Sequence, residues 1–154
     1  MNYAEEIGKI LTERNLTIST TESCTGGLLS SKLTDISGSS AYIKLNLVTY
    51  ANEVKEHMLG VVINEEGVVS ENCAYQMAKG LQKLTKSDIC VSTTGIAGPT
   101  GGTETKPVGL MYSTIYTKDH FKNYKIQVDS NLTRIQIKEK FTEEVMKNIY
   151  EFLK

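Results

Sequence analysis

Runs of β-favouring residues alternate with amphipathic stretches along almost the whole of this 154-residue chain. At its start, apolar residues between positions 3 and 11 recur at helical spacing, and the β-favouring run 16–20 follows them. Strands that are separated by helices usually lie parallel in one sheet, and the helices cover the faces of that sheet. The alternation therefore predicts a layered α/β domain with a mostly parallel sheet.

The same patterns predict the bounds of the other elements. Gly60 follows one helical stretch as a stop signal, and Ser70 precedes the next as a helix cap. We expect helices at residues 3–14, 28–36, 51–59, 71–84 and 134–153, and strands at 16–20, 42–50, 88–95, 110–117 and 124–130. The last two strands are close in the sequence and are expected to pair.

Length and composition limit the kinds of protein that this chain can be. A chain of 154 residues is about one typical domain, so we expect a single domain over residues 1–154. The formal net charge of -1 gives no field that would attract nucleic acid or an anionic membrane. No stretch reaches the about 20 apolar residues of a membrane span, and the acidic N-terminus is unlike a signal peptide. A cytoplasmic protein that binds neither nucleic acid nor membrane is therefore expected.

The cysteines and histidines are few and show no metal-ligand spacing. Cys24, Cys73 and Cys90 are an odd number, which fits reduced thiols better than a disulfide framework. The two histidines, His57 and His120, form no metal-binding pattern with them or with each other. We therefore expect free thiols and no metal site.

Residues 20–27, TTESCTGG, place three potential nucleophiles, Ser23, Cys24 and Thr25, directly before Gly26 and Gly27. Two glycines allow a sharp turn with uncovered backbone N–H groups, and a hydroxyl or thiol beside them can attack an electrophile. Ser23 could therefore be a nucleophile whose oxyanion is held by nearby N–H groups, with Cys24 as its rival. The alternative is a helix cap beside a glycine turn.

A serine nucleophile needs a base, and the sequence offers one unusual candidate. His57 and His120 both lie in charged segments, so a Ser-His-Asp arrangement has little support. Lys55 lies a turn or so into an expected helix and Tyr50 ends the strand before it, so both can face one cavity. A lysine whose pKa is lowered by burial can act as a base. The alternative is an ordinary surface lysine beside Glu56.

The segment 96–109, IAGPTGGTETKPVG, holds most of the turn signals in the chain. A loop of this length without periodicity is more often functional than a simple connection. Its glycines do not match the dinucleotide-binding or P-loop patterns, but its backbone N–H groups can still bind a phosphate or carboxylate. The residues expected to contribute are Thr94, Gly95, Gly98, Gly101 and Gly102. The alternative is a long hairpin-like connection.

Four long motifs follow one another in the chain: TTESCTGGLLSSKLTDISGSSAY, VTYANEVKEHMLGV, GVVSENCAYQMAKG and TTGIAGPTGGTETKPVGLMY. Together they resemble the C-terminal domain of the CinA family, which includes stand-alone nicotinamide mononucleotide deamidases, and the resemblance covers roughly residues 5 to 152. It implies a three-layer α/β/α sandwich with a mixed sheet, a homodimer, and no metal or organic cofactor.

The resemblance also implies roles for individual residues. The nucleophile of the family falls on Ser23, its general base on Lys55 and its supporting tyrosine on Tyr50. A hydroxyl at the head of the glycine loop falls on Thr94, and a phosphate-binding arginine falls on Arg134. The family usually has Gly-Asp-Arg at this last position, where the chain has Ser-Asn-Leu-Thr-Arg, but the only other arginine lies in the first expected helix.

The activity implied by the resemblance is hydrolysis of the carboxamide of nicotinamide mononucleotide to nicotinic acid mononucleotide and ammonia. A neutral Lys55 would remove the proton of Ser23, the N–H groups of residues 25–27 would hold the oxyanion, and the 95–103 loop with Arg134 would hold the phosphate. Two alternatives stay open. One is a non-catalytic ligand-binding or partner protein associated with competence or DNA damage, and the other is an amidohydrolase of a different amide.

Overall fold

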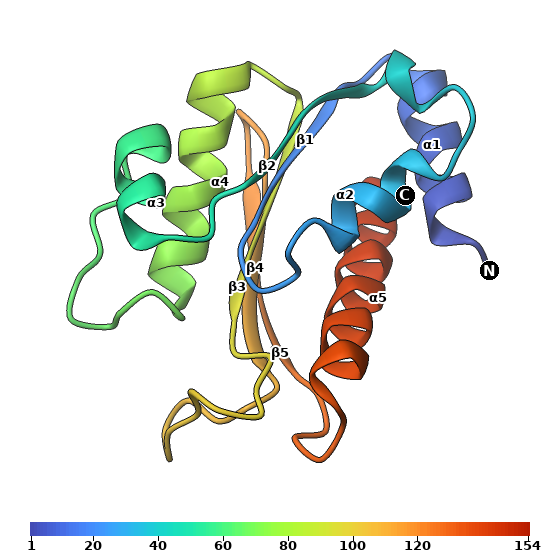
Figure 1. Ribbon diagram of the computed structural model, residues 1–154. Coiled ribbons are helices and arrows are strands. Elements are labelled where there is room, and N and C mark those ends of the chain that lie inside the picture. The colour runs from blue at the N-terminus through green and yellow to red at the C-terminus, as the bar shows by residue number, and fades with distance from the viewer.

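A five-stranded mixed sheet forms the middle layer of the molecule, seen nearly edge-on in Figure 1. The computed structural model describes residues 1–154, and its strands are β1 (Ile18–Glu22), β2 (Ile43–Val48), β3 (Ile89–Gly95), β4 (Leu110–Tyr116) and β5 (Phe121–Gln127). Their order across the sheet is β2-β1-β3-β4-β5. β1 pairs in parallel with β2 and β3, whereas β4 is antiparallel to both β3 and β5. Only β4 therefore runs against the other strands.

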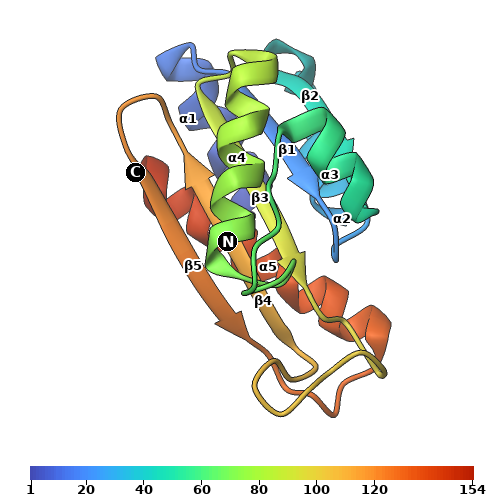
Figure 2. The same ribbon diagram turned by 90° about the vertical axis from the view of Figure 1, so that its left-hand side faces the viewer.

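Helices cover both faces of this sheet. One face carries α1 (Tyr3–Arg14), α2 (Leu28–Thr34) and α5 (Arg134–Leu153), and the other carries α3 (Asn52–Leu59) and α4 (Glu71–Thr85). Figures 1 and 2 show α3 and α4 together on one side, with α4 lying along the sheet. The predicted α/β class and the three-layer sandwich are confirmed. None of the helices is both long and apolar enough to cross a membrane.

Two hydrophobic clusters fill the space between the sheet and the helices on its two faces. The larger lies beneath α1, α2 and α5 and includes Leu11, Phe141 and Ile149, all of which are fully buried. The smaller lies beneath α3 and α4 and includes Cys73 and Cys90. All three cysteines of the chain are free, as expected, and these two fill the core as small apolar residues.

The predicted bounds are wrong chiefly at the last strand, which was expected at 124–130 and lies at Phe121–Gln127. The turn between β4 and β5 is tight, because the Thr117 N–H donates to the His120 carbonyl over 2.8 Å. The Thr117 hydroxyl also accepts from the His120 N–H over 3.0 Å. Pairing with β4 can therefore begin at Phe121.

The topology brings three loops together at one edge of the sheet. Because β1, β2 and β3 are parallel, the segments that follow them all leave from their carboxyl ends, which is where open α/β sheets usually bind ligands. α5 starts at the same edge. Its first turn is fixed by a capping box in which the Thr133 hydroxyl accepts from the Gln136 N–H and the Gln136 side chain accepts from the Thr133 N–H. Arg134, the first residue of α5, is thus held at this edge of the sheet.

Candidate active site

Ser23 and Lys55 are in contact at this edge of the sheet. The Lys55 Nζ donates to the Ser23 Oγ over 3.1 Å and to the backbone carbonyl of Tyr50 over 2.8 Å. Lys55 is 0% exposed and Ser23 is 9% exposed. The interpretation of Lys55 as a surface lysine is therefore wrong, and the pair has the geometry of a nucleophile and its base.

The surroundings of Lys55 favour its neutral form. Burial lowers the pKa of the Lys55 amine from its ordinary value of 10.5, because the ammonium ion loses its hydration. Lys55 forms no ion pair with a carboxylate. A buried amine without a counter-ion can accept a proton from a hydroxyl that it contacts.

The local sequence explains how Ser23 reaches this position. β1 ends at Glu22, so Ser23 is the first residue beyond the strand. Gly26 and Gly27 follow with φ angles of 58° and 100°, in the left-handed region that other residues rarely adopt. The chain therefore turns sharply and enters α2 at Leu28.

The N–H groups of the two glycines in this turn are already used within the chain. The Gly26 N–H donates to the Ser23 carbonyl over 3.0 Å, and the Gly27 N–H donates to the Glu22 carboxylate over 3.2 Å. The expectation that they hold an oxyanion is therefore wrong. The N–H groups of Cys24 and Thr25 donate no hydrogen bond to other residues and are the donors left beside Ser23.

Cys24 is not equivalent to Ser23 as a nucleophile. Its side chain is buried, and the loss of hydration raises the pKa of the thiol to about 12. Because the thiolate is the reactive form of cysteine, Cys24 stays an unreactive thiol at neutral pH. The structure thus separates two adjacent candidates that the sequence left open.

A cleft of about 230 Å³ opens next to Ser23. It is lined by Ser23, Cys24, Tyr50, Gly95, Ile96, Ala97, Gly98, Thr100, Gly101 and Arg134. Three glycines expected from the loop, at positions 95, 98 and 101, are therefore next to the nucleophile. Thr25, Gly26 and Gly27 instead line a separate hollow between α2 and α5.

Two other expected residues do not line the cleft. Thr94 is fully buried, and its hydroxyl donates to the Val68 carbonyl over 2.9 Å, so it fastens the segment before α4 to β3. At Gly102, a Cβ atom would lie 2.8 Å from the backbone nitrogen of Val108. Gly102 is thus needed for a close backbone approach inside the loop.

Tyr50 and Arg134 meet at the mouth of the cleft. One terminal nitrogen of Arg134 donates to the Gly98 carbonyl over 2.7 Å, and the other donates to the Tyr50 hydroxyl over 3.1 Å. Tyr50 thus contacts Lys55 through its backbone carbonyl, while its hydroxyl meets Arg134. Since a guanidinium has five N–H donors, Arg134 keeps donors for a ligand.

The glycine loop also presents unused donors to the cleft. The Ile96 N–H donates to the Leu110 carbonyl, and the Thr103 N–H donates to the Lys106 carbonyl, which fixes both ends of the loop. Between them, residues 97–102 donate no backbone hydrogen bond. Free N–H groups in a glycine-rich loop beside an arginine are typical of an anion-binding site.

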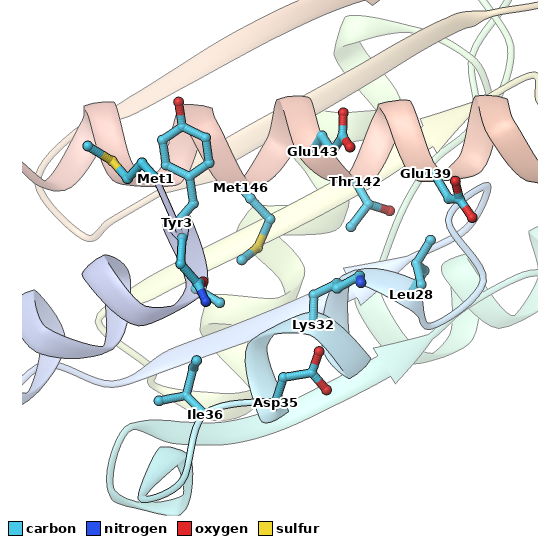
Figure 3. Close-up of a pocket in the computed structure, with 12 residues that line it drawn as sticks. Met1, Tyr3, Leu28, Lys32, Asp35, Ile36, Glu139, Thr142, Glu143 and Met146 are labelled. Carbon is cyan, nitrogen blue, oxygen red and sulfur yellow. The ribbon is translucent and has the colours of Figure 1, made fainter.

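A larger cavity, of about 610 Å³, lies elsewhere, between α1, α2 and α5. Figure 3 shows Lys32 and Asp35 on one side of it and Glu139 and Thr142 of α5 on the other. It contains no pairing of a nucleophile with a base. No group of three or more histidine, cysteine, aspartate or glutamate side chains is placed to hold a metal ion.

Residues missed by the sequence analysis lie just behind the cleft. Glu22 is fully buried and accepts hydrogen bonds from the turn and from α2, and Thr93 of β3 accepts from the Ser23 N–H over 3.2 Å. A glutamate at the end of a strand, directly before a nucleophile and a glycine turn, is the signal that could have identified Glu22. Nothing in the local sequence distinguishes Thr93 from its neighbour Thr94.

Comparisons with known proteins agree with this fold. The sequence profile described as "CinA C-terminal domain" matches residues 1–153. A "CinA-like protein" of Chloroherpeton thalassium is 44% identical over 158 aligned positions, which cover 99% of this chain and 38% of that protein. A "CinA-like protein" of Syntrophus aciditrophicus is 50% identical over 109 residues, which cover 69% of this chain and 26% of that protein.

Among solved structures, the competence/damage inducible protein CihA of Agrobacterium tumefaciens matches with a TM-score of 0.89 at 32% identity, covering 100% of this chain and 97% of that one. The chain spans well under half the length of the curated relatives that it matches. Because the family profile matches nearly every residue and the relatives are this similar, the chain belongs to the family of the CinA C-terminal domain.

Proposed function

We propose that the chain is a serine-lysine amidohydrolase that converts the carboxamide of nicotinamide mononucleotide to a carboxylate and ammonia. The observation that carries this proposal is the contact of 3.1 Å between the Lys55 Nζ and the Ser23 Oγ. Lys55 is buried without a carboxylate, and its lowered pKa favours the neutral amine that a base requires. A lysine that served only the fold would gain more from an ion pair or from solvent.

In the proposed reaction, the neutral Lys55 takes the hydroxyl proton of Ser23 as the Ser23 Oγ attacks the amide carbon. The N–H groups of Cys24 and Thr25 stabilise the oxyanion that forms. When the carbon–nitrogen bond breaks, Lys55 returns the proton to the departing nitrogen, which leaves as ammonia. Lys55 then removes a proton from water, and the resulting hydroxide attacks the carbonyl carbon of the acyl-enzyme. When the bond from that carbon to the Ser23 Oγ breaks, Lys55 returns the proton to the Ser23 Oγ, and the acid product leaves.

The rest of the cleft suits a substrate with an amide at one end and a phosphate at the other. Its volume of about 230 Å³ is smaller than the about 300–1,000 Å³ of a typical ligand pocket, so it takes the amide-bearing ring while the phosphate stays near the surface. The free donors of Arg134 and of the 97–102 loop are there to bind it. Binding energy from a remote phosphate can orient the amide against Ser23.

Incubation of the purified chain with nicotinamide mononucleotide, followed by an ammonia assay, tests the proposal. Mass spectrometry of acid-quenched enzyme should find the acyl adduct on the peptide that contains Ser23, with Ser23→Ala as the matched control. If only other amides release ammonia, the serine-lysine mechanism stands and nicotinamide mononucleotide is not the substrate. No ammonia from any amide, together with binding of the nucleotide by calorimetry, would favour a non-catalytic ligand-binding protein.

Two expectations stay predictions: the homodimer, which the family resemblance implies, and the cytoplasmic location, which the sequence of the chain suggests. The homodimer can be measured by light scattering of the purified chain, and the cytoplasmic location by fractionation of cells. The solved relative carries the name competence/damage inducible protein. For this chain we propose the hydrolysis alone and no role in competence or DNA damage.

A further inference from the structure

A line of hydrogen bonds connects a buried carboxylate to the backbone of Ser23. The Ser23 N–H donates to the Thr93 Oγ1 over 3.2 Å, the Thr93 Oγ1 lies 2.9 Å from the Thr25 Oγ1, and the Thr25 hydroxyl donates to the Glu22 Oε1 over 2.6 Å. The Thr25 hydroxyl is the donor in this last contact, so its proton points to Glu22. Thr93 must then donate to Thr25, and its oxygen is left to accept from Ser23.

Glu22 is the fixed end of this line. Its carboxylate is 0% exposed, has no ion-pair partner, and accepts five hydrogen bonds. One oxygen accepts from the Thr25 hydroxyl and from the N–H groups of Gly27 and Leu29, and the other accepts from the N–H and hydroxyl of Ser30. Hydrogen bonds in the protein interior are strong, and five of them on one carboxylate fix its position. Glu22 therefore ties the end of β1 to the first turn of α2.

We infer that Glu22 and Thr93 are positioning residues for the nucleophile, which hold the Ser23 backbone so that its Oγ stays in contact with Lys55. The inference rests on the proposed function and adds to it two residues that do not line the cleft. The Ser23 backbone has this one side-chain acceptor for its N–H, and that acceptor is oriented in turn by the carboxylate. A misplacement of about 1 Å at a reacting group can cost about a hundredfold in rate.

The pair Thr93→Val and Thr93→Ser tests this inference. Valine keeps the shape of threonine and removes the hydroxyl, so the Ser23 N–H and the Thr25 oxygen each lose their partner. We expect kcat to fall about a hundredfold in Thr93→Val, with KM changed by less than about twofold, because binding groups are untouched. Thr93→Ser keeps the hydroxyl and should retain most of kcat.

Thr114→Val is the matched control. Thr114 is also a fully buried threonine of the sheet, and its hydroxyl donates to the Asn123 side chain over 2.7 Å. It lies opposite Ser92, so it faces the α4 side of the sheet, and its hydroxyl takes no part in the hydrogen bonds that reach Ser23. This variant loses one buried hydroxyl and should keep the wild-type kcat. The melting temperature of each variant measures the general cost of the same substitution.

Two further measurements do not depend on the identity of the substrate. The rate at which a fluorophosphonate labels Ser23 should fall in Thr93→Val and be restored in Thr93→Ser. Crystal structures of wild type and Thr93→Val should show the separation of 3.1 Å between the Ser23 Oγ and the Lys55 Nζ lost in the variant. If wild type is labelled but does not hydrolyse nicotinamide mononucleotide, the proposed substrate fails while the labelling rates still test the positioning role.

Other results would overturn the inference. Wild-type kcat and labelling in Thr93→Val would show that Ser23 needs no such support. Equal losses in Thr93→Val and Thr93→Ser would show that packing matters and the hydroxyl does not. Glu22→Gln should lower kcat in the same way and cost more stability, because its amide nitrogen would face N–H donors. If that variant does not fold, the two Thr93 variants decide the question.

Discussion

Lys55→Met removes a buried amine and keeps an unbranched side chain of similar length, so it isolates the cost of burying that amine. In the folded chain Lys55 is 0% exposed, and burial lowers its pKa below 10.5, whereas the unfolded chain has the ordinary pKa. Between these two pKa values the unfolded chain binds more protons than the folded chain. The free energy of unfolding of wild type must therefore rise with pH in this window.

The size of this rise is set by the single proton that Lys55 binds in the unfolded chain and not in the folded chain. The rise can reach about 1.4 kcal/mol per pH unit inside the window and vanishes above the unfolded pKa. The free energy of unfolding of Lys55→Met has no such pH-dependent contribution from residue 55. The variant also loses two hydrogen bonds, to Ser23 and Tyr50, each of which contributes about 1 kcal/mol. The stability of Lys55→Met relative to wild type should thus be most favourable at low pH and should decline as the pH approaches the unfolded pKa.

Urea unfolding of wild type and Lys55→Met across neutral and alkaline pH measures this difference, and titrations shared by both proteins cancel. Lys125→Met is the control, since Lys125 is exposed and forms no ion pair. A difference between wild type and Lys55→Met that does not change with pH would refute the argument, because folding would then leave the pKa of Lys55 unchanged. The same lowered pKa predicts that kcat of wild type rises with pH and levels off below 10.5.

Three further predictions concern the site and the fold. Ser23→Ala should abolish turnover with the fold intact, whereas Cys24→Ala should keep most of the activity because its thiol stays protonated, as steady-state kinetics can measure. Arg134→Lys should raise KM for nicotinamide mononucleotide about tenfold or more with a smaller effect on kcat, and an unchanged KM would assign the phosphate to the glycine loop alone. Gly80→Ala should lower the free energy of unfolding by about 1–3 kcal/mol or more, since its Cβ would lie 2.0 Å from the Leu59 carbonyl oxygen. Wild-type stability of Gly80→Ala in urea would contradict the close packing of α3 and α4.

Much of the fold could be predicted from local patterns. Helix α5 was expected at 134–153 and lies at Arg134–Leu153, because its apolar stripe and its capping residues are all encoded within one segment. The start of β5 was misplaced, since the hydrogen bonds between Thr117 and His120 that end the turn involve side chains whose orientation no periodicity reveals. Pairing partners and strand order are likewise non-local properties.

The features of the site likewise fall into those that the sequence determines and those that only the tertiary structure determines. The sequence by itself determined which residue types stand beside the glycine turn, and the family resemblance assigned Ser23 and Lys55 their roles. Only the tertiary structure decided that they touch, because their contact joins the end of β1 to the start of α3. It also decided that the Gly27 N–H is used by Glu22. Burial, which lowers the pKa of Lys55 and raises that of Cys24, arises from the packing of separate elements and cannot be read from any one segment.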